Sequence, residues 1–123
     1  MYYKNEGFTN KEAKLFWKAV EEHEPQLSAL QAATGRIGVK GAKWLSKAIK
    51  AMPTIVEINL STNPLGDKAV AVLAETLKDC PNITKLNLST TSMGDQGMRA
   101  LALAMSTKYF YLPASSVFCI FYL

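Results

Sequence analysis

Cysteine is scarce in this 123-residue chain, and its scarcity argues against one class of protein. Cys80 and Cys119 are the two cysteines, and neither belongs to a motif with metal-ligand spacing. Small disulfide-stabilised domains carry several cysteine pairs, because the bridges compensate for a small core. The sequence therefore predicts no disulfide framework and favours the reducing cytoplasm as the location.

Residues suited to catalysis are also few. His23 is the single histidine and stands between Glu22 and Glu24, where a solvated side chain near a helix end is expected. The chain has no GxxxxGK[ST], GxGxxG or HExxH motif. The three glycines spaced by three from Gly35 to Gly41 are interpreted as turn and helix-start residues. We therefore predict a protein that is not an enzyme and has no bound cofactor or metal.

Long apolar runs are missing. No stretch approaches the roughly 20 apolar residues that a membrane-spanning helix needs, so no span is predicted. The first 14 residues contain no apolar segment of the signal-peptide type. Seven apolar residues, Val117 to Leu123, end the chain and form an aggregation-prone segment if they are exposed.

What the chain does contain is a repeat with a period of 28 residues. One copy covers residues 55–82, the next covers 83–110, and a weaker copy covers 27–54. The apolar residues that open the strongest copy recur in the next one: Ile55, Ile58 and Leu60 become Ile83, Leu86 and Leu88. Self-similarity at a fixed period indicates stacked structural units that share one core.

Each copy holds two periodicities in a fixed order. Ile58 and Leu60 have strand spacing, and a turn rich in Asn, Pro and Gly follows. A helical stripe then begins, and Asp67 or Asp95 stands before it, where we predict that the carboxylate caps its own helix. The predicted stripes are Val70, Leu73, Ala74 and Leu77; Met98, Leu101, Ala102 and Met105; and Ala42, Leu45, Ser46 and Ile49.

Stacked copies of this unit predict an α/β fold. One strand and one helix cannot bury these stripes alone, whereas neighbouring copies cover each other. The strands should run parallel on the inner, concave side and the helices on the convex side, because helices are wider than strands (about 10 Å against about 4.8 Å). The sequence thus predicts a short solenoid.

The pattern LxxLxLxxNxLGD followed by a helix resembles the leucine-rich repeat, and its 28-residue length resembles the ribonuclease-inhibitor subtype. The resemblance covers residues 27–110 and is weakest in 27–54. It implies that Asn63 bonds neighbouring backbone, whereas Gly35 and Thr91 stand at the corresponding positions of the other copies. Ala32 and Val39 depart from the pattern in the first copy, so an irregular strand is expected there.

The two ends lie outside the repeats. Residues 1–26 are predicted to form an N-terminal cap, with an amphipathic helix over 8–23 that begins in a Thr9–Glu12 capping box and ends at Glu24-Pro25; a partner-binding helix is the alternative. Residues 111–123 form an apolar tail that does not continue the repeat. The tail either folds back over the last repeat, marks a truncated piece of a longer protein, or contacts a partner, a membrane or a second copy of the chain.

Two surfaces are candidates for binding. The first is the concave strand face, whose candidate residues are Glu57, Asn59, Thr62, Lys85, Asn87 and Thr90. Its strand positions lack Trp, Tyr and Arg, the usual anchors of tight interfaces. The second is a basic stripe of Lys40, Lys43, Lys47 and Lys50 in the most basic copy, whose net charge is +5. This stripe suits an acidic partner, phosphates or an anionic membrane, or it is only a solvated helix face.

The function predicted first is a non-catalytic protein–protein interaction module that binds a protein partner and no nucleic acid. The resemblance also implies two alternatives. One is a fragment similar to the Ran-type GTPase-activating proteins. The other is a structural component of a cytoskeletal or flagellar assembly.

Overall fold

A computed structural model describes residues 2–4, 7–80, 82–104 and 120–122 of the chain. Strands and helices alternate along most of it. The elements are β1 (Tyr2–Lys4), α1 (Asn10–His23), β2 (Ala29–Gln31), α2 (Val39–Lys50), β3 (Glu57–Asn59), α3 (Gly66–Lys78), β4 (Lys85–Asn87), α4 (Asp95–Ala104) and β5 (Ile120–Tyr122).

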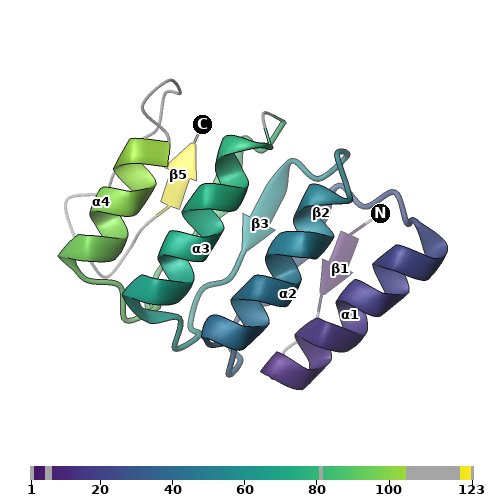
Figure 1. Cartoon of the computed structure of the whole chain (residues 1–123), viewed down its shortest axis with the longest axis horizontal. Helices are drawn as coiled ribbons and strands as arrows, with labels where there is room; N and C mark the ends of the chain where they lie inside the picture. The colour runs from purple at the N-terminus through teal and green to yellow at the C-terminus, as the bar shows by residue number, and fades with distance from the viewer. Residues whose placement is uncertain (1, 5–6, 81, 105–119, 123) are drawn as a thin grey trace.

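The strands form one sheet in the order in which they occur in the chain, from β1 to β5. The pairs β1–β2, β2–β3 and β3–β4 are parallel, and Ile58 lies opposite both Leu30 and Leu86. Helices α1 to α4 lie side by side as a single layer over one face of this sheet (Figure 1). The predicted mixed α/β architecture with a small parallel sheet is therefore confirmed.

The core lies between the helix layer and the sheet. Each central strand buries its middle residue toward the helices: Leu30, Ile58 and Leu86 are at most 1% exposed. The apolar stripes predicted for α2 and α3 are buried throughout. In α4 the prediction was partly wrong, because Ala102 is exposed and Ala104 is buried instead. Helix α4 packs on α3, and no other described helix lies beside it.

The first copy is more regular than its sequence predicted. Strand β2 pairs in register with both of its neighbours, and Ala32 is fully buried in the place of a leucine. Helix α2 starts at Val39 without a side-chain cap of its own. The expected irregularity was wrong, because the backbone ladder tolerates a small side chain at a position that the neighbouring repeats already cover.

Strand β1 was not foreseen. Its register places Tyr2 opposite Ala29, so a parallel strand precedes α1 just as one precedes each later helix. The expected helix itself is confirmed: it covers Asn10–His23, the Thr9 side chain accepts a hydrogen bond from the Glu12 amide at 3.3 Å, and Glu24 ends the helix at a φ of 45°.

The starts of α2 and α4 are capped by a residue of the preceding helix. Asp67 Oδ1 accepts hydrogen bonds from the amides of Gly94 (2.7 Å) and Gly97 (2.9 Å), which open α4. The predicted capping of α3 by Asp67 was therefore wrong. Asn10 does the same for α2, since its Oδ1 accepts from the amides of Gly38 and Gly41. A carboxylate or amide oxygen at these amides satisfies donors that a helix leaves free.

These contacts explain why two helix positions are glycine. A Cβ on Gly41 would stand 2.4 Å from Asn10 Oδ1, and a Cβ on Gly97 would stand 2.8 Å from Asp67 Oδ1. Any larger residue would displace the oxygen that caps the helix. A polar cap and a close glycine therefore tie the start of α2 to α1 and the start of α4 to α3.

The C-terminal strand differs from the others in its direction. Strand β5 pairs antiparallel with β4, with Leu86 opposite Phe121. This pairing occupies the edge of β4 and is the arrangement expected of a tail that folds back over the last repeat. The rest of the tail, residues 111–119 and 123, lies outside the described residues, as does the stripe residue Met105.

Replacing Asp67 by alanine should destabilise the protein by about 1–2 kcal/mol, because two amides at the start of α4 lose their acceptor. The measurement is urea unfolding followed by circular dichroism. Asp95→Ala is the matched control, because Asp95 occupies the same repeat position and is exposed. Equal losses in both variants would contradict capping across repeats.

Candidate functional site

The face of the sheet that the helices leave uncovered is termed here the open sheet face. Its side chains come from alternate strand residues that flank the buried middle residue of each strand. In β3 and β4 these are Glu57 and Asn59, and Lys85 and Asn87, all partly exposed. The strand register places Glu57 beside Lys85 and Asn59 beside Asn87. Four of the six predicted candidate residues are thus brought together.

The two charges on this face are paired with each other. Lys85 Nζ lies 3.6 Å from Glu57 Oε1, and the side chains are 40% and 35% exposed. Gln31 Nε2, on the next strand, donates to the same carboxylate oxygen at 3.2 Å. The Glu57 carboxylate is therefore held from both neighbouring strands, and the open sheet face presents a neutral, hydrogen-bonded row.

The two asparagines use their oxygens locally. Asn59 Oδ1 accepts from the Ser61 amide at 3.0 Å, and Asn87 Oδ1 accepts from the Ser89 amide at 3.0 Å. Each bond closes a turn directly after the strand, which fixes the orientation of the amide group. The same side-chain geometry therefore recurs 28 residues apart on neighbouring strands.

Thr62 and Thr90 lie further along, where the strands end. Both are exposed and have a positive φ, 57° and 55°, and Thr34 has the same conformation at 59°. A β-branched residue in this region costs about 1–2 kcal/mol. Backbone bonds to the next repeat maintain it: the Thr34 amide donates to Ser61 O, and the Thr62 amide donates to Ser89 O, both at 2.9 Å.

The three threonines therefore form a column of strained, exposed hydroxyl residues at one end of the open sheet face. Beside Thr34 and Thr62 lies a shallow hollow that is also lined by Gly7, Thr9, Gly35 and Arg36. Arg36 is exposed. Arg36 was missed as a candidate binding residue. The strand positions contain no arginine, and Arg36 follows the turn after the strand. Its place directly after Gly35, the residue that corresponds to Asn63 one repeat later, was the signal that could have revealed it.

The basic stripe lies elsewhere. Lys40, Lys43, Lys47 and Lys50 are all exposed on α2, which belongs to the helix layer and not to the sheet (Figure 1). Lys50 forms an ion pair with Asp79 of α3 at 3.5 Å. The predicted candidates thus separate into two surfaces, which no single small ligand can contact.

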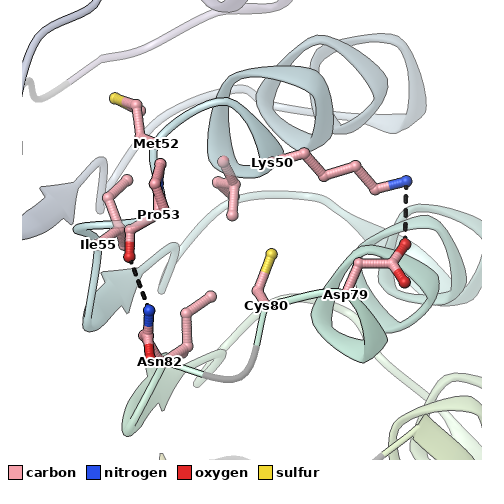
Figure 2. A pocket seen from close by; sticks show the side chains of 9 residues that line it. Lys50, Met52, Pro53, Ile55, Asp79, Cys80 and Asn82 are labelled. Atoms are coloured by element: carbon pink, nitrogen blue, oxygen red, sulfur yellow. Dashed lines mark hydrogen bonds and ion pairs between the residues drawn. The ribbon is translucent and has the colours of Figure 1, made fainter.

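A small, partly open hollow lies where α2 and α3 end (Figure 2). Its volume is about 50 Å³, whereas ligand pockets usually measure about 300–1,000 Å³. The Lys50–Asp79 ion pair and a hydrogen bond from Asn82 Nδ2 to Pro53 O (3.1 Å) join the two repeats on either side of it. We therefore interpret it as an imperfectly filled junction between repeats.

In the part of the chain that the structure describes, no three His, Cys, Asp or Glu side chains are grouped so that they could hold a metal ion. No helix there is long and apolar enough to cross a membrane.

Comparison with protein families gives one match. Residues 79–102, which contain β4 and most of α4, match the family model described as Leucine Rich repeat. This match supports a leucine-rich repeat protein. The matched segment overlaps the last predicted copy, 83–110, over residues 83–102, and buried middle residues recur in strands β2 and β3. Among curated proteins, no significant match to the chain is found.

The ion pair between Glu57 and Lys85 should contribute about 0.2–1 kcal/mol to stability at low salt, as cross-strand charge pairs do at exposed sites. A double-mutant cycle of Glu57→Gln and Lys85→Gln, followed by urea unfolding, measures this coupling. It should fall toward zero at about 1 M salt, because screening weakens exposed pairs.

The control cycle combines Glu57→Gln with Lys68→Gln on α3, which should be additive. Zero coupling between Glu57 and Lys85 at low salt would mean that the two charges act independently on the open sheet face.

Proposed function

We propose that the chain is a protein-interaction module that binds a protein partner on the open sheet face. Leucine-rich repeats are typically non-catalytic interaction modules, and the last copy matches that family. We further propose that the repeats stack as a short solenoid of the ribonuclease-inhibitor subtype, with this face on its concave side. The 28-residue register between neighbouring strands supports that arrangement.

The observation that carries the proposal is the row of partly exposed side chains in strict register on a face that no described helix covers. Residues one repeat apart present the same groups at the spacing of neighbouring strands, about 4.8 Å. A partner therefore meets two asparagine amides and three threonine hydroxyls in repeated positions. Their orientation is fixed by turns and backbone bonds, which lowers the entropy cost of binding.

The chemistry of the face favours a polar partner of low net charge. Glu57 and Lys85 neutralise each other, and the remaining groups are small and uncharged. Arg36, at the edge of the hollow, is the residue best suited to anchor a partner carbonyl or carboxylate. We therefore expect affinity to depend on hydrogen bonding around Arg36 and Thr62 more than on long-range attraction.

The cellular location and the two alternative functions remain predictions. We expect a cytoplasmic protein that does not bind nucleic acid on this face. The described residues do not favour a GTPase-activating fragment or an assembly component over a simple interaction module. The candidate contact through the apolar tail concerns residues that lie mostly outside the described part of the chain.

The test replaces Thr62 by a photocrosslinking amino acid and identifies the proteins captured in cells. Thr62 is exposed on the proposed site, so crosslinked partners should appear, and the additional substitution Arg36→Ala should reduce their yield about tenfold or more. The matched control carries the crosslinker at Lys68, which is exposed on helix α3.

The same products from both positions, or a yield unchanged by Arg36→Ala, would contradict the proposal. Circular dichroism of each variant checks that the fold is retained. An exposed arginine whose side chain has no described contact is not expected to alter stability by more than about 0.5 kcal/mol.

A further inference from the structure

The layer of helices carries a second candidate binding surface, separate from the open sheet face. Helices α1 and α2 pack side by side (Figure 1), and both present exposed lysines. We term this surface the basic helix face, and its lysines are Lys11, Lys14 and Lys18 on α1 and Lys40, Lys43 and Lys47 on α2. Their spacing, i, i+3 and i+7 on each helix, places each set on one side of its helix.

Trp44 joins the two sets of lysines. Lys14 Nζ lies 5.5 Å from the centroid of the Trp44 ring, and Lys47 Nζ lies 4.8 Å from it. The indole is half-buried between α1 and α2 and thus brings an ammonium group from each helix over one ring. The lysines of both helices therefore belong to one continuous patch.

Helix α2 carries four lysines and no acidic residue, whereas α1 carries three glutamates beside its three lysines. Glu12 contacts Thr9 at the start of α1, while Glu21 and Glu22 are confined to its last turns. On α3, by contrast, Lys78 is paired with Glu75 at 3.0 Å. The excess positive charge is therefore carried by α2, and the lysines of α1 extend the surface without adding net charge. Lys50 is left out of the patch, because it is paired with Asp79.

An apolar side chain lies on the same helix face. Leu15 is 54% exposed and follows Lys14 directly, within one turn of Lys11 and Lys18. A surface with lysines around an exposed leucine and a half-buried tryptophan can lie on a bilayer, with the ammonium groups at the headgroups and the leucine in the interfacial region. Clusters of four to eight lysines on helices are typical of sites for anionic lipids.

We propose that the basic helix face docks on an anionic phospholipid membrane. Three features favour a lipid surface over other acidic partners. The cations on this face are all lysines, which suit a diffuse negative surface, whereas paired recognition of carboxylates favours arginine. The Trp44 ring is covered by two ammonium groups, which disfavours stacking with nucleic acid bases. Leu15 adds an apolar contact that an acidic peptide does not need.

This docking uses the side of the molecule opposite the open sheet face. A membrane-bound chain can therefore still bind a protein partner on the open sheet face. Because the two proposals concern different surfaces, disproof of one does not affect the other. The geometry would hold the partner-binding face away from the bilayer.

The test is co-sedimentation of the whole chain with unilamellar vesicles at about 0.1 M salt, where exposed charges are only partly screened. One set of vesicles is phosphatidylcholine alone, and the other contains one fifth phosphatidylserine. The chain should sediment with the second set only. Lys40→Gln/Lys43→Gln should weaken this binding about 30-fold, since each lysine near the surface contributes about fivefold.

Two further variants make the result specific. Lys68→Gln/Lys78→Gln on α3 removes the same charge from another helix and should change binding by no more than about twofold. Leu15→Ser should weaken vesicle binding several-fold and leave binding to poly-glutamate unchanged, because only a bilayer offers an apolar layer.

Equal sedimentation with both vesicle sets, or equal losses in the two lysine double variants, would overturn the proposal. Binding to poly-glutamate or duplex DNA without binding to the vesicles would also overturn it and assign the face to another class of partner. Circular dichroism confirms folding of each variant.

Discussion

The side-chain amide of Asn63 is the interaction on which the arrangement of the repeats most depends. Asn63 is 2% exposed, and its Nδ2 donates to the carbonyls of Ala32, Leu60 and Ser61 at 2.9–3.2 Å. Its Oδ1 accepts from the Ile37 amide at 3.2 Å. One buried side chain therefore satisfies backbone groups of two repeats at the place where their strands end. Without it, the Ser61 carbonyl would keep its bond from the Thr34 amide, but the other groups would lose the partner that Asn63 provides, which costs about 1–3 kcal/mol for each buried group left unpaired.

The same constraint shapes the candidate binding surface. The chain must turn sharply after each strand to reach its helix, and it does so through threonines with a positive φ. The turns at Thr34 and Thr62 are held by bonds to the next repeat, and local bonds hold the asparagine amides. Stability and presentation of the open sheet face thus come from one set of contacts, whereas the basic helix face depends only on the exposed sides of α1 and α2.

Much of the fold can be predicted from the sequence, because apolar periodicity reports burial directly. Ile58, Leu60 and the apolar stripe of α3 are buried as expected. Contacts between repeats could not be predicted, since the partner of Asp67 lies 27–30 residues away and no local rule identifies it. Strand β1 was missed because three residues, Tyr2–Lys4, show no periodicity of their own. In the candidate site, the 28-residue period predicts that Glu57 lies beside Lys85. The positive φ of Thr62 could not be predicted, because threonine rarely adopts this conformation and the sequence gives no sign of it.

The central claim is that no repeat is stable alone, because neighbouring repeats share hydrogen bonds and core. Native-state hydrogen exchange of the Asn63→Ala variant tests it most directly. The account predicts that the most protected amides of β2, α2 and α3 all lose the same free energy of protection, about 2–3 kcal/mol. A loss confined to the turn around residues 61–66, with unchanged protection in α2, would contradict it.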